Sequence, residues 1–436
     1  MERNAILKLA ESYDSFYLYE EAVILRNINR LKADFPGVSF LYSAKCNPYP
    51  KVLECVLAQG FGIDAASAAE CVMGQRAGLE PNQILYSAPG KTLADIKAAL
   101  PIATVIADSA GEVGRIQQAA AELGITADIG LRVNPDFSYG TDSGAASKFG
   151  IDEAQIYAKL PEWKQLPNIR IVGIHTHLKS QELSVEVLKS YYQKMFRLAV
   201  SMREVFGILK FLNLGSGMGI PMRETEQPFD TAALGQEAQR LMTAFREKLP
   251  ETRVCIETGR YVSGTAGTYA ARVVDKKISY GKTFVLLNNT LNGFARPSIV
   301  AMMQHFMGDG PIAGWEPIYT GDHTVQIIPL VETRERETVT VAGNLCTGTD
   351  VVLADAELPR MEVGDVVTIP NAGAYAAVIT PMQFASLKRP AQLFLRVRHD
   401  VRTHVIGRKM TDRHPSIPLE HVVPMGQDEL YFPIQH

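Results

Sequence analysis

The sequence has few cysteines, little net charge and no long hydrophobic run, and each of these absences excludes a class of protein. Its five cysteines are odd in number and show no C-x-x-C spacing, which argues against a disulfide scaffold and a structural zinc site. The net charge of −3 supplies no basic field for nucleic acid or anionic lipid. No stretch of about 20 apolar residues is present, and the N-terminus lacks the apolar run of a signal peptide. We therefore expect a reduced, cytoplasmic protein with no nucleic-acid or membrane partner.

Two regions with different hydrophobic patterns divide the chain of 436 residues, which is 46% apolar. From about residue 20 to 260, short β-branched runs alternate with amphipathic patterns such as Ala22–Leu31 and Ser184–Val205. This alternation predicts parallel strands joined by crossover helices. We expect eight strands, which begin near Val38, Gly62, Ile84, Thr104, Asp128, Ile169, Phe211 and Arg253. Eight such units favour an α/β fold with a closed (β/α)8 TIM barrel over residues 22–265, and an open doubly wound sheet is the alternative.

The second region, residues 266–436, shows the alternating pattern of an antiparallel β domain. Its predicted strands, separated by turn residues, include Thr268–Val274, Thr283–Leu287, Val339–Val341 and Val366–Ile369. Phe16–Tyr19 also has the pattern of a strand, and we expect residues 1–21 to join this domain because chain ends often pack together. The chain from about residue 402 onward is polar and weakly patterned, which indicates a C-terminal extension.

The first predicted strand of the barrel ends in a lysine. Lys45 comes directly after the apolar run Phe40–Ala44. In a barrel the chemistry is found at the C-terminal ends of the strands, so this side chain is expected to face the barrel mouth. Desolvation there favours a neutral amine, which can form an imine with an aldehyde. Taken alone, a lysine at the rim with its charge in solvent is the more common explanation.

The sixth and seventh predicted strands end in a histidine pair and a glycine-rich turn. His175 and His177 are two residues apart and point to the same side of a strand, so a zinc site is an alternative, although no third ligand stands out by spacing. Gly215–Ile220 has glycine at every second position and follows the seventh strand, where barrels commonly bind phosphate. Glycine lets backbone N–H groups approach an anion closely. A Rossmann nucleotide site would instead need this turn after the first strand.

The eighth predicted strand ends in a glutamate, followed closely by an arginine. Glu257 at the end of a buried strand is costly unless it binds a cation or a donor, and a protonated pyridine nitrogen is such a donor. Arg260 can bind the same phosphate as the glycine-rich turn, while a simple Glu–Arg pair at the rim is the alternative. Lys45, the glycine-rich turn, Arg260 and Glu257 together fit one ligand, pyridoxal 5′-phosphate.

A series of motifs in one order resembles the barrel-type (fold type III) pyridoxal-phosphate decarboxylases, the group of the diaminopimelate, ornithine and arginine decarboxylases. The resemblance runs from about Phe16 to Leu395. Its motifs are Y-S-A-K at Tyr42–Lys45, D-A-A-S-A-A-E at Asp64–Glu70, R-V-N-P at Arg132–Pro135, S-K-F-G at Ser147–Gly150, H-L-K-S-Q at His177–Gln181, G-S-G-M-G at Gly215–Gly219, E-T-G-R at Glu257–Arg260, C-T-G-T-D at Cys346–Asp350 and G-A-Y at Gly373–Tyr375. So many ordered motifs are specific for the family.

The resemblance implies a role for many of these positions, and we predict no metal site. Lys45 would hold the cofactor, His177 would stack on its ring, and Glu257 would bond the ring nitrogen so that the ring accepts electrons. Further cofactor contacts, several of them to the phosphate, are implied for Asp64, Ser180, Gly217, Met218, Gly219, Gly259, Arg260 and Tyr375. Cys346 would act in the partner subunit's site and protonate the carbanion left by carbon dioxide, because the family works as a head-to-tail homodimer with shared sites.

The positions that meet the substrate depart from the family pattern. Relatives that act on diamino acids carry an acidic residue directly after the cysteine, where this sequence has Thr347. Arg296 matches an arginine that holds a distal carboxylate in diaminopimelate decarboxylases, but the tyrosine expected four residues later is Val300. The aromatic–asparagine pair near the C-terminus is here Phe384-Ala385.

A further departure adds a positive charge, because the family's Gly-Ser-Gln turn reads Lys179-Ser180-Gln181. The predicted substrate contacts are therefore Arg296, Thr347, Lys179 and Asp350. The changes remove a negative partner and keep or add positive ones. They favour a carboxylate-rich amino-acid conjugate as the small-molecule substrate, such as a citrate-linked amino acid of siderophore biosynthesis.

Other activities stay open at this point. A diaminopimelate or basic diamino-acid decarboxylase is the first alternative, and an amino-acid racemase is the second. A racemase requires a tyrosine opposite the lysine and usually has an arginine at the ring nitrogen. Glu257 at that position therefore favours decarboxylation. A non-catalytic pyridoxal-phosphate carrier would lack the β domain and the cysteine loop, both of which are present.

Overall fold

The computed structural model describes residues 3–307, 326–333, 335–397 and 422–424. These fall into two compact units, one formed by residues 25–262 and the other by residues 1–24 together with 263–436. Most of the predicted C-terminal extension lies outside the described residues. Within the described part of the chain, no helix is both long and apolar enough to cross a membrane.

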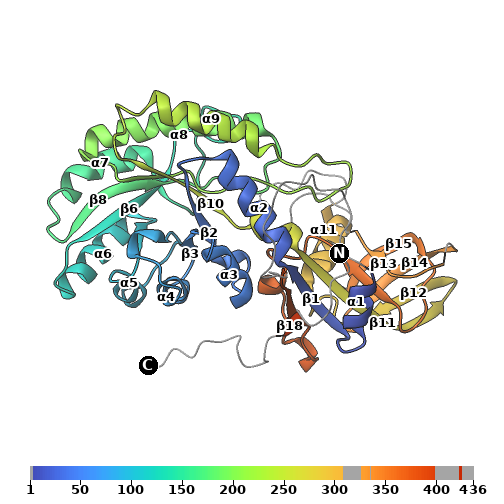
Figure 1. Cartoon of the computed structure of the whole chain (residues 1–436). Coiled ribbons are helices and arrows are strands. Elements are labelled where there is room, and N and C mark those ends of the chain that lie inside the picture. Colours follow the sequence, from blue (N-terminus) through green and yellow to red (C-terminus); the bar gives the residue numbers. More distant parts are fainter. Residues whose placement is uncertain (1–2, 308–325, 334, 398–421, 425–436) are drawn as a thin grey trace, which may run out of the picture. The chain divides into compact units, whose positions relative to one another are not determined.

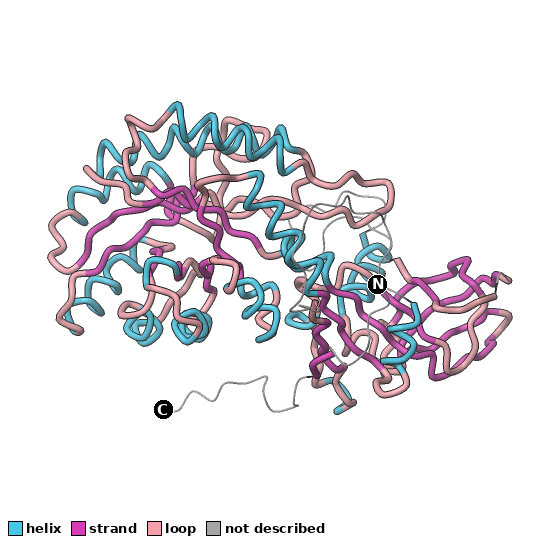
Figure 2. The backbone as a smooth tube through the Cα atoms, viewed as in Figure 1, coloured by secondary structure: helices cyan, strands magenta, loops and turns pink. Residues whose placement is uncertain are grey.

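The first unit is a closed barrel of parallel strands surrounded by helices (Figures 1 and 2). The eight strands of the ring are β2 Ser39–Ser43, β3 Gly62–Ala65, β4 Ile84–Tyr86, β5 Thr104–Ala107, β6 Ala127–Asn134, β8 Ile169–His175, β9 Phe211–Asn213 and β10 Arg253–Thr258. Pairing of β10 with β2 and of β5 with β6 closes the ring, and the two-residue strand β7, Ile151–Asp152, adds to β6. The predicted (β/α)8 barrel is confirmed, and the open-sheet alternative was wrong.

Polar side chains cap the first turns of several helices of this unit. Ser67, Thr92, Ser109, Ser184 and Asp230 each accept a hydrogen bond from a backbone N–H in the first turn of a helix. Such caps satisfy donors that the first turn leaves unpaired. The helices are α2 Glu21–Asp34, α3 Pro50–Leu57, α4 Ala68–Arg76, α5 Leu93–Ala99, α6 Ala110–Glu122, α7 Glu153–Trp163, α8 Val185–Phe206, α9 Thr231–Ala244 and α10 Arg260–Ser263.

Apolar side chains fill the inside of the barrel, so the functional groups are confined to its mouth. One buried cluster consists of Leu41, Leu85, Ile106, Val172, Phe211 and Cys255. The Phe211 ring takes space that only glycine leaves, since a Cβ on Gly173 would lie 2.2 Å from it. Close packing of this kind makes the barrel a rigid support for the residues at its strand ends.

Within its described residues, the second unit contains β-strands and two α-helices. Its elements are α1 Arg3–Ala10, β1 Ser15–Glu20, β11 Gly267–Ser279, β12 Lys282–Leu287, α11 Ala295–Met307, β13 Ile328–Pro329, β14 Arg336–Gly343, β15 Val351–Pro359, β16 Val366–Ile369, β17 Ala391–Leu395 and β18 Val422–Pro424. The predicted strand at Phe16–Tyr19 lies in β1, which pairs antiparallel with β11. Most pairs are antiparallel as predicted, but β1 with β17 and β12 with β14 are parallel.

Candidate active site at the mouth of the barrel

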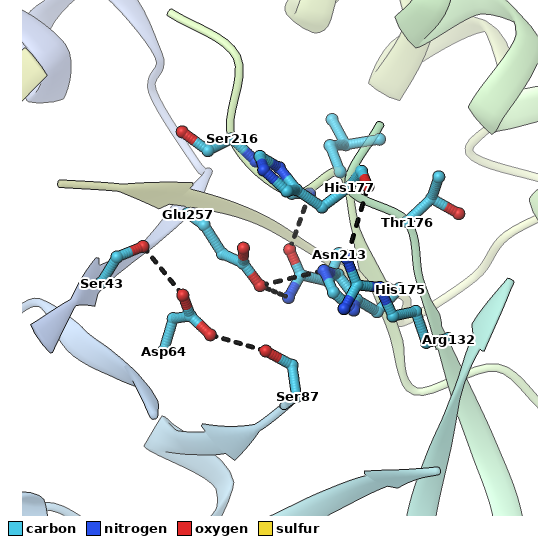
Figure 3. Close-up of polar contacts among 12 residues, drawn as sticks. Ser43, Asp64, Ser87, Arg132, His175, Thr176, His177, Asn213, Ser216 and Glu257 are labelled. Atoms are coloured by element: carbon cyan, nitrogen blue, oxygen red, sulfur yellow. Dashed lines mark hydrogen bonds and ion pairs between the residues drawn. The ribbon is translucent and has the colours of Figure 1, made fainter. Parts of the chain in front are cut away.

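A lysine–aspartate ion pair lies at the ends of β2 and β3. Lys45 is in the single 3-10 turn Ala44–Cys46 that follows β2, and its Nζ is 2.5 Å from Oδ2 of Asp64. The Asp64 side chain is fully buried, and it also accepts hydrogen bonds from the hydroxyls of Ser43 at 2.8 Å and Ser87 at 2.7 Å (Figure 3). Three donors thus stabilise the buried charge of Asp64, which holds the Lys45 amine at the mouth.

A second buried carboxylate, Glu257, lies at the end of β10. Its Oε1 accepts a hydrogen bond from Nδ2 of Asn213 at 2.9 Å and lies 3.1 Å from Nε2 of His175 (Figure 3). Burial raises the pKa of Glu257, but the interaction with His175 outweighs this and holds the pKa well below its usual range. Glu257 is therefore ionised in a site where only 2% of the residue is exposed. An anion kept ionised at this depth is suited to a cationic or protonated ring partner.

His177, just after β8, contacts the glycine-rich turn. Its Nδ1 accepts a hydrogen bond from the backbone N–H of Ser216 at 3.2 Å, and its Nε2 is 3.3 Å from Oγ of Ser180. Because Nδ1 is an acceptor, the ring proton belongs on Nε2 in the neutral form. Burial lowers the pKa of His177 to about 4 against the opposing effect of Glu257, so the ring is neutral at pH 7. A neutral imidazole is a suitable flat surface for an aromatic ring.

The glycine-rich turn after β9 has no room for side chains at its glycines. A Cβ on Gly215, whose φ is 65°, would lie 2.2 Å from the carbonyl oxygen of Thr176, and one on Gly217 would lie 2.9 Å from Leu188. Backbone hydrogen bonds of Glu182 with Gly217 at 2.8 Å and with Gly219 at 2.9 Å fix the turn. Such a turn presents backbone N–H groups at close range, which is the arrangement that binds phosphate.

Two further predicted phosphate contacts follow β10. Gly259 is buried where a Cβ would lie 2.8 Å from Sγ of Cys46, and Arg260 is 5% exposed at the start of α10. Met218, within the glycine-rich turn, is 3% exposed. The barrel unit therefore brings Lys45, Asp64 and the other predicted cofactor residues of this unit to its mouth; the rest of that group are His177, Ser180, Gly217, Met218, Gly219, Glu257, Gly259 and Arg260.

Five predicted site residues belong to the second unit. Cys346 is an exposed free thiol on the loop after β14, and Thr347 on the same loop contacts the hydroxyl of Thr349 at 3.0 Å. Asp350 is 2% exposed and accepts hydrogen bonds from Thr290 and from the backbone N–H groups of Leu291 and Leu345. These bonds engage both carboxylate oxygens inside the unit, so the geometry gives Asp350 a part in holding the Cys346 loop.

Arg296 and Tyr375 are neighbours in the second unit. Arg296 is 5% exposed and donates hydrogen bonds to the carbonyls of Asn371 at 2.6 Å and Ala374 at 3.3 Å. Its guanidinium also lies over the ring of Phe294, 5.0 Å from the centroid. Tyr375, next to Ala374, has a φ of 50°, which is uncommon for a residue with a side chain. On the barrel, Lys179 is half exposed and 3.5 Å from Glu182.

Some residues of the site were not predicted. Asn213 ends β9 and contacts Glu257, while Ser43 and Ser87 hold Asp64. Each stands at or just after the C-terminal end of a barrel strand, so the rule used for Lys45 and Glu257 could have found them. The zinc alternative finds no support in the described residues, where no three His, Cys, Asp or Glu side chains converge on a common point.

Barrel, amine, buried carboxylates and glycine-rich turn together define an α/β-barrel enzyme that binds a phosphorylated ring. Residues 21–264 match the family described as pyridoxal-dependent decarboxylase, pyridoxal binding domain, and the chain belongs to that family, as its motifs predicted. It is a pyridoxal-phosphate-dependent amino-acid decarboxylase, a carboxy-lyase. This assignment favours decarboxylation over the racemase and carrier alternatives.

The relatives cover nearly the whole chain. An L-glutamyl-[BtrI acyl-carrier protein] decarboxylase of Niallia circulans is 27% identical over 91% of this chain and 92% of that protein. A diaminopimelate decarboxylase of Methanothermobacter thermautotrophicus is 30% identical over 89% of each. Among solved structures, the diaminopimelate decarboxylase of M. jannaschii in complex with L-lysine has a TM-score of 0.78, at 25% identity and 89% coverage of each chain.

The residues present fit the cofactor. A Cβ at Gly215 or Gly217 would collide with Thr176 or Leu188, so these positions carry no side chain that could cover the backbone N–H groups of the turn. A primary amine at Lys45, an ionised carboxylate at Glu257 and a neutral ring at His177 match the aldehyde, the pyridine nitrogen and the ring face of pyridoxal phosphate.

Proposed function

We propose that this decarboxylase removes the α-carboxylate of an amino-acid conjugate rich in carboxylates, such as a citrate-linked siderophore intermediate. The observation that carries the proposal is Thr347, a neutral residue directly after Cys346 where an acidic partner for a distal ammonium would stand. Lys179 and Arg296 add positive charge to the set. A substrate with extra carboxylates would gain from these cations, while a free distal ammonium would be repelled.

We propose that the barrel residues described above hold the cofactor, together with Tyr375 of the second unit. Lys45 would hold its aldehyde carbon, His177 would cover the ring, and Glu257 would keep the ring nitrogen protonated. The backbone of Gly217–Gly219 would bind the phosphate, together with Gly259, Arg260 and Tyr375. Asp64 and Ser180 act by holding Lys45 and His177. When bound, the cofactor supplies an electron sink for the pair of electrons left by carbon dioxide.

Cys346 completes the proposed chemistry as the acid that protonates Cα. Its thiol is exposed on its loop, as a group that reaches a substrate must be. We propose that the enzyme is a homodimer in which Cys346 serves the site of the partner, and Asp350 holds the loop that carries it. This is a cytoplasmic enzyme in the proposal, consistent with five unpaired cysteines.

One relative supports a conjugated substrate. The Niallia circulans protein is named for action on a glutamyl group carried by an acyl-carrier protein, so a pendant group is compatible with this fold. The second candidate substrate is diaminopimelate, and Arg296 favours it because the sequence keeps the arginine that holds a distal carboxylate in those enzymes. The two candidates differ in the charge at the far end of the substrate.

A panel of substrates tests the proposal. Purified enzyme should release carbon dioxide fastest from conjugates with two or more extra carboxylates, and slowly from diaminopimelate, ornithine and lysine. Lys45→Ala should abolish activity and the absorbance of the bound cofactor. Ordinary rates on diaminopimelate with none on the conjugates would overturn the substrate proposal and leave the decarboxylase assignment intact.

A charge reversal sharpens the test. Thr347→Asp should raise KM for the carboxylate-rich substrate by roughly tenfold or more, because a new like charge faces it. Thr333→Asp, at an exposed threonine outside the Cys346 loop, is the matched control and should change KM far less. Equal effects of the two variants would show that the position after Cys346 does not meet the substrate.

A further inference from the structure

Two loops form one side of the barrel mouth. The histidine loop, residues 176–182, follows β8, and the glycine turn, residues 215–219, follows β9. They are joined by the backbone hydrogen bonds of Glu182 with Gly217 and Gly219, and by the bond from Ser216 N–H to His177 Nδ1 at 3.2 Å. Figure 3 shows Ser216 beside His177. Any change in their spacing would move the ring-stacking histidine relative to the phosphate turn.

One buried hydroxyl connects the bases of both loops. Tyr191, in the second turn of α8, is 2% exposed, and its hydroxyl lies 3.0 Å from the carbonyl oxygen of Thr176 and 3.0 Å from that of Leu214. Thr176 is the residue before His177, and Leu214 is the residue before Gly215. A single hydroxyl proton shared between two buried carbonyls satisfies both of them and keeps them at a fixed distance.

The surroundings keep this hydroxyl in place as a donor. Burial raises the pKa of Tyr191 well above its usual range, so the phenol is protonated and can donate at neutral pH. The ring of Tyr139 packs edge-on against it at 5.1 Å, and the Tyr139 hydroxyl lies 3.5 Å from the carbonyls of Lys179 and Ser216, one in each loop. Tyr139 and Tyr191 therefore each contact backbone carbonyls in or next to both loops.

We propose that Tyr191 is a positioning residue for the cofactor's phosphate ester, acting through the spacing of the histidine loop and the glycine turn. The inference rests on the proposed function, in which the glycine turn binds the phosphate. Backbone N–H donors bind an anion well only when held to within about 0.5 Å of their places. Without the hydroxyl, the carbonyls of Thr176 and Leu214 face each other with no donor between them, which widens the spacing of the two loops next to these residues.

The neighbouring residue supplies a matched control. Tyr192 is on the same helix and 4% exposed, and within the described residues no hydrogen-bond partner lies within reach of its hydroxyl. Tyr191→Phe and Tyr192→Phe therefore remove the same atom from adjacent buried rings. Only the first removes a contact with the two loops.

The experiment compares binding of pyridoxal 5′-phosphate and unphosphorylated pyridoxal to cofactor-free enzyme, by absorbance titration, with melting temperatures measured in parallel. Tyr191→Phe should weaken binding of the phosphorylated form about tenfold and that of pyridoxal little, and the 31P resonance of the bound cofactor should shift. Tyr192→Phe should leave both affinities within about twofold.

The possible outcomes distinguish a failure of the inference about Tyr191 from a failure of the proposed function. A wild-type preference for the phosphorylated form that survives Tyr191→Phe, even with a lowered melting temperature, overturns the inference because Tyr191 is then only structural. Equal losses in the two variants overturn it as well. If the wild type itself showed no preference for the phosphorylated form, the glycine turn would not be the phosphate site, and the proposed function would fail first.

Discussion

At the scale of single residues, the environment of Glu257 decides what the barrel mouth can do. The carboxylate is ionised because His175 lies 3.1 Å away and Asn213 donates a hydrogen bond at 2.9 Å. Asn213 also accepts a bond from the N–H of Gly215 at 2.9 Å. One amide thereby links the carboxylate to the start of the glycine turn.

Asn213→Ala should lower kcat roughly 10- to 100-fold, because a hydrogen bond to a charged group is lost and the carboxylate is free to turn. Steady-state release of carbon dioxide measures the change. In a double-mutant cycle with Glu257→Gln, the double variant should be no slower than Glu257→Gln alone, since Asn213 acts through Glu257. Additive losses in the cycle would contradict this role.

The second prediction at this scale concerns pH. His177 binds a proton near pH 6.5 in the unfolded chain but only at about pH 4 in the folded one. Between these values the unfolded state binds more protons, so the free energy of unfolding rises with pH. The cofactor-free enzyme should lose about 1–3 kcal/mol of stability from this group as pH falls from 6.5 to 4.

Denaturant titration across this pH range measures the loss. His177→Asn should flatten the dependence, because asparagine does not titrate there. If the variant showed the same slope as the wild type, the loss would come from other groups.

At the scale of elements, a buried ion pair joins the loops after β4 and β5. Glu112, in the first turn of α6, is 2.8 Å from Nζ of Lys91 and accepts hydrogen bonds from the N–H groups of Lys91 at 3.0 Å and Asp108 at 2.9 Å. Both side chains are at most 1% exposed. Asp108 in turn contacts Arg132 at 3.3 Å, so the pair supports loops at the same end of the barrel as the site.

Lys91→Met should lower the free energy of unfolding of the barrel unit by about 3–5 kcal/mol, because it leaves the Glu112 carboxylate buried without its cation. Urea titration measures the change. Lys159→Met is the control, since its pair with Glu162 at 2.9 Å is exposed, and it should change stability by less than about 1 kcal/mol. Similar losses of unfolding free energy in both variants would show that burial of the ion pair does not determine its effect on stability.

The elements themselves were largely predictable. Six of the eight barrel strands begin at the predicted residue, and Ser39 and Ala127 are each one residue from it. Buried parallel strands are short apolar runs bounded by turns, which a local pattern shows directly. The parallel pairs of β1 with β17 and β12 with β14 were not predicted, because a strand's partner is chosen by contacts far away in sequence.

At the scale of the whole molecule, the predicted residues fall into two sets. Lys45 and His177 belong to the unit of residues 25–262, whereas Cys346 belongs to the other unit. In the proposed homodimer, each active site would use Lys45 of one subunit and Cys346 of its partner. Neither subunit would then have a complete active site of its own.

Complementation between inactive variants tests whether the two residues of one site come from different subunits. A heterodimer of Lys45→Ala and Cys346→Ala subunits, isolated with two affinity tags, should recover about half of wild-type activity, since one of its two shared sites is intact. A heterodimer of Lys45→Ala and His177→Ala subunits should stay inactive, because both residues come from the same barrel. No recovery in the first heterodimer would place Cys346 in the site of its own chain.

The sequence by itself determined the barrel, its strand ends and the cofactor, because each depends on local signals: apolar runs, a glycine-rich turn, and polar residues directly after strands. It also determined the family, through motifs such as Tyr42–Lys45 and Glu257–Arg260. Tertiary structure alone decided which groups hold those residues in place. Asn213 at Glu257, the three donors around Asp64, and Tyr191 between the bases of two loops are contacts across 15 or more residues of chain. Such contacts form only when the barrel closes and brings distant segments together, so a local sequence pattern cannot predict them.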